Sequence, residues 1–96
     1  MKTLKNSDVS GARQNVKDIV VVGNGDMFKL LCKAYSVNEG WMKSTKAMEV
    51  PGGCVVQVTT QQQNPDGSYV VAEALSFVPC VKIADDENNG RKLIAI

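Results

Sequence analysis

Histidine is absent from this sequence of 96 residues, and its absence narrows the chemistry open to the chain. Histidine is the commonest general base, a frequent metal ligand and the usual activator of a nucleophile near neutral pH. The chain also has no G-x-S-x-G elbow, no Walker lysine loop, no G-x-G-x-x-G and no H-E-x-x-H. We therefore expect a binding protein rather than an enzyme, with no cofactor and no metal site.

Cysteine is scarce as well. Cys32, Cys54 and Cys80 are odd in number and far apart, and the chain has no C-x-x-C pair. This spacing suits neither a disulfide framework nor a zinc site. Because each cysteine lies among apolar neighbours, we expect three reduced thiols, packed in a core, in a cytoplasmic protein.

The sequence lacks both a strong charge of one sign and a long apolar run. The chain has eleven basic and ten acidic residues, so we expect no strongly basic surface that could hold duplex nucleic acid. No apolar run approaches the roughly 20 residues that cross a bilayer, and the first residues do not resemble a signal peptide. We expect a protein that does not bind membranes. We expect its ligand to be a small molecule held by a few local cations.

The length allows one domain with a thin stability margin. Residues 1–15 are polar and without apolar periodicity, so we interpret them as an arm in which Ser7 is placed to cap a short helix. Residues 16–96 form the predicted domain. Self-association would add buried area to so small a core, and we therefore expect a homo-oligomer.

Short β-branched segments separated by turn residues predict a mainly β fold. The second segment also fits a helical period, and its assignment as a strand depends on the strand signals around it. We expect a small antiparallel barrel or sandwich of about six strands. The predicted strand segments are Val16–Val22, Met27–Val37, Trp41–Val50, Cys54–Thr60, a long segment from Ser68 to Ile83, and Arg91–Ile96.

The sharpest local signal is a hairpin whose turn is Asn64-Pro65-Asp66-Gly67. Proline suits the first corner of a type I turn, and glycine supplies the positive φ of the following bulge. This turn places Thr60 opposite Ala72 and Val58 opposite Ala74. The even-numbered face is the more apolar one, so we expect it to be the core and the odd-numbered face to be the working surface.

Aromatic and cationic residues mark the candidate ligand site. Trp41 stands close to Lys43 and Lys46 in the chain, which suits stacking on a base and contact with a phosphate. An ordinary strand with solvated lysines accounts for the same pattern. A second cation follows a turn whose amides suit an anion. Chosen by chemistry in this way, the candidate ligand-binding residues are Phe28, Trp41, Lys43, Lys46, Tyr69, Asn89 and Arg91.

Three segments carry a resemblance to a known family: Trp41–Met48, Gly53–Gln62 and Ala72–Pro79. With them the chain resembles the anti-Thoeris sponge proteins of bacteriophages. The resemblance implies a compact, β-rich oligomer that sequesters cyclic ADP-ribose isomers or cyclic oligonucleotides in the infected bacterial cytoplasm, without degrading them. A phage structural or regulatory protein that binds another protein or single-stranded nucleic acid is the alternative.

Overall fold

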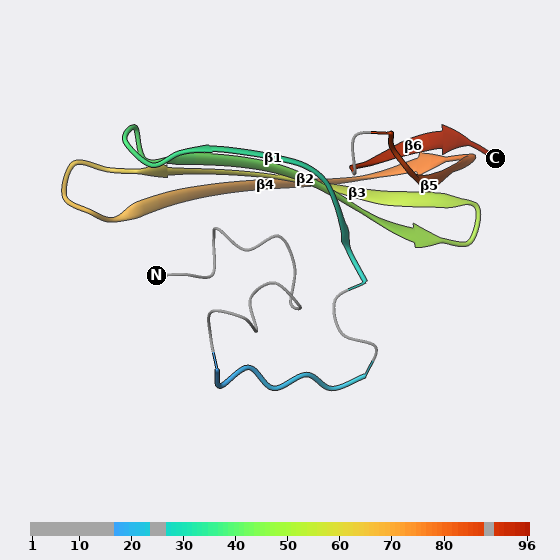
Figure 1. Ribbon diagram of the computed structural model, residues 1–96, viewed down its shortest axis with the longest axis horizontal. Helices are drawn as coiled ribbons and strands as arrows, with labels where there is room; N and C mark the ends of the chain where they lie inside the picture. Colours follow the sequence, from blue (N-terminus) through green and yellow to red (C-terminus); the bar gives the residue numbers. More distant parts are fainter. Residues whose placement is uncertain (1–16, 24–26, 88–89) are drawn as a thin grey trace.

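Six antiparallel strands form two sheets in the computed structural model, which describes residues 17–23, 27–87 and 90–96 (Figure 1). The four-stranded sheet follows the chain order and contains β1 (Lys29–Ser36), β2 (Trp41–Val50), β3 (Gly53–Gln63) and β4 (Tyr69–Pro79). The two-stranded sheet contains β5 (Val81–Asp85) and β6 (Arg91–Ala95). The mainly β prediction is confirmed, including the strand in the ambiguous second segment. The strands form two open sheets, with β1 and β4 as the outer strands of the larger one.

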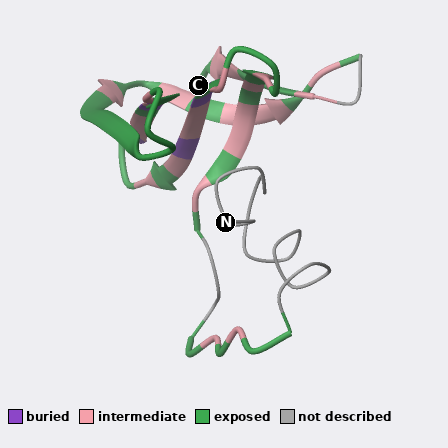
Figure 2. Cartoon of the chain, turned by 90° about the vertical axis from the view of Figure 1, so that its left-hand side faces the viewer, coloured by how far each residue is buried: buried purple, intermediate pink, exposed green. Residues whose placement is uncertain are grey.

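The predicted strand at the beginning of the domain is wrong for the residues that the structure describes. Residues 17–22 form a turn followed by irregular chain, which Figure 2 shows apart from both sheets. Val22 is 91% exposed, so its side chain has little to pack against. β-Branched residues favour a strand only where a neighbouring strand pairs with them, and none of the described strands pairs with this segment. The predicted N-terminal arm lies outside the described residues.

The β3–β4 hairpin has the predicted register. Thr60 lies opposite Ala72, and Val58 lies opposite Ala74. The pairing continues without a shift from Gln63 and Tyr69 to Gly53 and Pro79, because the turn sets one alignment for the whole ladder.

The hairpin turn also has the predicted chemistry. Asn64 N donates to Ser68 O at 2.7 Å, and Gly67 N donates to Asn64 O at 3.0 Å. Gly67 has a φ of +90°, which glycine adopts without strain. Asp66 Oδ1 accepts bonds from Ser68 Oγ at 2.6 Å and from Ser68 N at 2.9 Å. These bonds stabilise the carboxylate and lower the pKa of Asp66.

The expectation that the even-numbered face of this hairpin is the core holds at Cys54, which is fully buried, but is wrong farther along that face. Val58 is 43% exposed, whereas Thr59 and Gln61 on the odd-numbered face are buried. The alternation of a strand shows which residues share a face, but another element must decide which face is covered. On the even-numbered face, β5 reaches only the end of the sheet, where Cys54 lies.

The core is small. The buried hydrophobic residues of the described part are Met42, Ala47 and Cys54, and Figure 2 shows buried positions only over short stretches. Cys54 therefore lies in the core as predicted, but Cys32 and Cys80 are exposed, contrary to expectation. Within the described part, no helix has the length and apolar character needed to cross a bilayer.

Cys80 joins β4 to β5 in a backbone conformation that glycine prefers. Its φ is +60°, while its N donates to Gly52 O at 2.8 Å and its O accepts from Ile96 N at 3.0 Å. Backbone hydrogen bonds on both sides hold the backbone of Cys80 in this left-handed conformation, while its thiol is exposed. These bonds, rather than packing of the thiol, determine its position.

We predict that Cys80→Gly stabilises the fold. It removes about 1–2 kcal/mol of left-handed strain and costs about 0.5–1 kcal/mol in unfolded-state entropy. Urea unfolding should therefore show a gain of about 0.5 kcal/mol. Cys32→Gly, an exposed cysteine within β1, is the matched control and should lower stability. If both changes lower it equally, the turn does not depend on the left-handed conformation.

Candidate functional site

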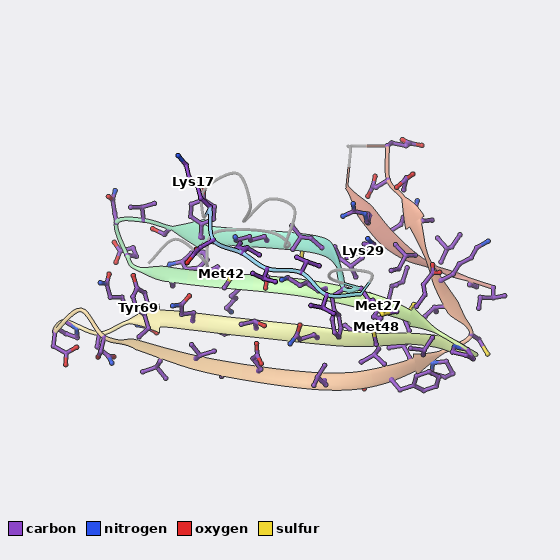
Figure 3. All side chains as sticks on the ribbon, turned by 90° about the horizontal axis from the view of Figure 1, so that it is seen from below. Lys17, Met27, Lys29, Met42, Met48 and Tyr69 are labelled. Carbon is purple, nitrogen blue, oxygen red and sulfur yellow. The ribbon has the colours of Figure 1, made fainter. Side chains whose placement is uncertain are left out.

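A cavity of about 570 Å³ lies where the two sheets meet. Strand β1 begins at Lys29, opposite Ala47, so the ladder between β1 and β2 stops short of the last residues of β2. Figure 3 shows Met27, Lys29 and Met48 gathered at this end of the four-stranded sheet. The volume falls within the range of small-molecule sites. Two cations, two carboxylates and several apolar side chains line this inter-sheet cavity: Lys29, Arg91, Glu49, Asp85, Met27, Met48 and Ile83.

Hydrogen bonds between the sheets shape this cavity. Glu49 Oε1 accepts a bond from Ile83 N at 3.0 Å, and Arg91 Nη1 donates to Leu30 O at 3.2 Å. Arg91 also stands directly opposite Asp85 in the β5–β6 ladder. The bond to Leu30 uses one of the five N–H donors of a guanidinium group. The cavity thus combines cationic donors with carboxylate acceptors, which suits a ligand that carries both anionic oxygens and hydroxyl or amino groups.

A second hollow, of about 310 Å³, lies at the opposite end of the four-stranded sheet. Trp41 and Lys43 line it together with Thr60 and Gln62. Trp41 is 38% exposed. Met48 lies seven residues after Trp41 along β2, which is about 23 Å at 3.3 Å per residue.

The structure therefore divides the predicted site residues. It brings Trp41 and Lys43 together at one end of the sheet, while Arg91 lines the inter-sheet cavity at the other end. Lys46 belongs to the opposite face of β2 from Lys43, because side chains alternate along a strand. Tyr69 lies at the same end as Trp41 but pairs with Gln63, on the other face.

Two predicted residues remain. Phe28 is half-buried and lies in the chain between two residues of the inter-sheet cavity, Met27 and Lys29. Asn89 lies outside the described residues. Sequence reasoning missed Lys29, Glu49 and Asp85 as cavity residues. The polar turn after Asp85 was a usable signal for its position opposite Arg91, but nothing in the sequence indicated that β5 would meet the end of β2.

A row of polar residues crosses the face of the sheet that carries the odd-numbered residues of the β3–β4 hairpin. Lys33, Ser44, Thr59 and Glu73 stand opposite one another on the four successive strands. Thr59 Oγ1 donates to Glu73 Oε1 at 3.1 Å. Lys33 Nζ is buried without a hydrogen-bond partner in the part of the chain that the structure describes, and it lies 5.8 Å from the centre of the Tyr35 ring.

Burial, and then the charge of Lys46, lowers the pKa of Lys33 below its usual 10.5. At neutral pH the charged Lys33 ammonium therefore lowers the free energy of unfolding, because its burial disfavours the folded state. As pH rises through the lowered pKa toward 10.5, the unfolded chain holds the proton longer than the folded chain, so folding becomes more favourable.

We predict that Lys33→Met stabilises the protein at neutral pH, because it removes a buried charge and keeps a flexible apolar stem. Its advantage over the native chain should shrink as pH rises toward 10.5. Urea unfolding across this pH range measures the difference. Lys43→Met, on the opposite face of the same strand pair, is the matched control for the loss of a lysine from this sheet. An advantage of Lys33→Met that grew with pH would contradict the assigned direction of the pKa shift.

The sequence matches the model of the Lockin family over residues 1–94. No curated protein and no solved structure shows a significant match. The family match by itself names no ligand, so the resemblance to the anti-Thoeris sponge proteins remains a basis for a proposal. Because the family model covers nearly the whole chain, this protein belongs to the Lockin family.

Proposed function

We propose that this chain is a binding protein that holds a small phosphate-bearing nucleotide in the inter-sheet cavity without altering it. The observation that supports this proposal is the set of groups lining a cavity of about 570 Å³. The Lys29 ammonium and the Arg91 guanidinium suit phosphate oxygens. The Glu49 and Asp85 carboxylates suit ribose hydroxyls or a base amino group.

The apolar part of the same cavity supports contact with a base. Met27 and Met48 are unbranched and polarizable, and such side chains adapt to a flat ring. Because the lining charges are balanced, a bare anion would gain little there. A nucleotide, which carries phosphate, hydroxyl and aromatic groups together, matches the lining more fully.

Binding without turnover agrees with the composition of the chain. The sequence has no histidine, which would otherwise be the first candidate for a general base. With the resemblance to the phage sponge proteins, the proposed role is that of a phage-encoded anti-defence protein. It would sequester a cyclic ADP-ribose isomer or a cyclic oligonucleotide that the infected bacterium makes as an immune signal.

We predict that Arg91→Ala weakens nucleotide binding about tenfold to a hundredfold, since one charge-assisted contact contributes roughly 1.5–3 kcal/mol. Calorimetric titration with cyclic ADP-ribose isomers and cyclic oligonucleotides measures this effect. Lys29→Ala should act in the same direction. Lys43→Ala, at the far end of the sheet, is the matched control and should bind like the native chain.

Two further measurements make that titration decisive. Circular dichroism must show that Arg91→Ala keeps the fold, because this side chain also bonds to Leu30. Chromatography of the recovered ligand must show it unchanged. No heat with any of these nucleotides would contradict the proposed function, and a chemically altered ligand would show that the chain is an enzyme.

The second hollow supports a second candidate function, the binding of single-stranded nucleic acid. There Trp41 offers an exposed aromatic face beside the Lys43 cation and the Gln62 amide. Stacking on an aromatic ring next to a cation is the usual way in which proteins hold unpaired bases. This surface would serve the alternative role of a phage regulatory protein.

The chain contains one tryptophan, so its fluorescence reports on this second hollow alone. We predict that a nucleotide held in the inter-sheet cavity leaves the emission nearly unchanged, because about 23 Å of strand separates the two places. Quenching by a single-stranded oligonucleotide, but not by cyclic nucleotides, would favour the second candidate. Strong quenching by a cyclic nucleotide would show that the ligand occupies the hollow at Trp41 instead.

A further inference from the structure

Strand β4 is an outer strand with apolar side chains exposed on both of its faces. Leu75 is 62% exposed and Phe77 51% exposed on one face, and Val70 is exposed on the other. Among the described residues, no strand lies beyond β4 in the sheet, and Figure 3 shows β4, in pale orange, as the outermost strand at one edge. Outer strands in natural proteins commonly carry lysines, bulges or prolines that discourage pairing. β4 contains no lysine, pairs with β3 without a bulge, and has a proline only at its end.

The turn of the hairpin shows which backbone groups face the open edge. Asn64 and Ser68 form a hydrogen-bonded pair, because Asn64 N donates to Ser68 O. Hydrogen-bonded and non-hydrogen-bonded pairs alternate along an antiparallel ladder. Even-numbered residues of β4 therefore direct their N–H and C=O groups toward β3. The odd-numbered residues, with Glu73 and Leu75 at the middle, direct theirs to the open edge.

We propose that two copies of this chain pair along β4, antiparallel, about a two-fold axis at Ala74. A centre at Ala74 brings the whole of Tyr69–Pro79 into register with the same strand of the second copy. The four-stranded sheets of the two copies then join into one continuous sheet. This inference stands apart from the proposed nucleotide binding, because the inter-sheet cavity lies on the β1 and β2 side of the sheet.

The side chains of β4 suit this self-pairing. With the axis at Ala74, Val71 stands opposite Phe77 of the partner subunit, so apolar groups meet on the odd-numbered face. Glu73, the one charged residue of β4, stands opposite the partner's Leu75 rather than its own copy, and its carboxylate already accepts a bond from Thr59. At the axis the two Ala74 residues form a non-hydrogen-bonded pair, where strands come closest and a methyl group fits.

The other outer strand is a poorer partner for β4. Strand β1 has a bulge between Leu30 and Cys32, which breaks its regular edge. The Leu30 carbonyl already accepts the Arg91 bond. Pairing of β4 with β1 would also build an open-ended row of subunits, whereas pairing of β4 with β4 closes after two copies. The proposed dimer therefore pairs β4 of one copy with β4 of the other.

A cysteine cross-link tests the register. In a non-hydrogen-bonded pair the two α-carbons are about 4.5 Å apart, which a disulfide can bridge. Ala74→Cys, in a chain that also carries Cys32→Ser and Cys80→Ser, should yield mostly covalent dimer on mild oxidation. Ala72→Cys in the same background is the matched control, because two copies of residue 72 lie about 13 Å apart along the strand and should not cross-link. Equal cross-linking of the two variants would overturn the proposed axis.

Native mass measurement tests the assembly itself. The native chain should have twice the mass of one copy at micromolar concentration, and Leu75→Pro should halve that mass. Proline at residue 75 removes an N–H that faces the open edge and leaves the β3 ladder intact, so circular dichroism should show the same strand content. A monomeric native chain, or a Leu75→Pro variant that stays dimeric, would overturn the proposal. A dimer that binds no nucleotide would remove only the proposed function.

Discussion

The contact of β5 and β6 with the end of the larger sheet is the constraint on which the rest of the structure depends. Bonds that make this contact in the described part of the chain include Ile83 N to Glu49, Arg91 to Leu30 O, and Cys54 Sγ to Val81 O at 3.6 Å. Burial, and then the nearby Glu49 charge, raises the pKa of the Cys54 thiol, which keeps it protonated as a donor. The same contact encloses Cys54 and shapes the inter-sheet cavity. The burial of Cys54 and the shape of the candidate site therefore depend on the same junction.

Away from this junction the larger sheet has little cover on its even-numbered face. Val58 and Val70 remain exposed there, while polar residues such as Thr59 and Gln61 are buried on the opposite face. A chain this small has little apolar area to cover both faces of a sheet whose longest strands have 11 residues. Joining β4 to a second copy would cover apolar area and satisfy the backbone edge at the same time. Assembly and stability are thus coupled in the proposed dimer.

The candidate binding groups occupy opposite ends of one sheet. The inter-sheet cavity combines cations with carboxylates, and the hollow at Trp41 combines an aromatic face with a cation and amides. These lining groups favour different ligands: a compact nucleotide in the first and an unpaired base of a longer strand in the second. Because the proposed dimer axis lies on β4, the cavity beside β1 would stay open in each copy. Two identical and separate sites per dimer are the expected arrangement.

The sequence by itself determined those features that depend on neighbours along the chain. The turn residues from Asn64 to Gly67 specify the hairpin and its register, because proline and glycine restrict the backbone locally. The β-branched runs specify most of the strands for the same local reason. The segment at Val20 and Val22 is the exception, since strand propensity is realised only when a partner strand is present.

Only the tertiary structure decided which face of the hairpin is covered and which residues share a cavity. Lys29, Glu49 and Arg91 belong to three different strands, and their meeting depends on where the short β5–β6 sheet packs. The alternation of Trp41 to Lys46 was readable, yet its two lysines point to opposite faces and only one accompanies the tryptophan. Local patterns specify conformation, whereas a site is a long-range packing outcome. The physical reason is that a residue is buried when an element distant in the sequence packs against it. The spacing of residues within one strand does not specify which element that is.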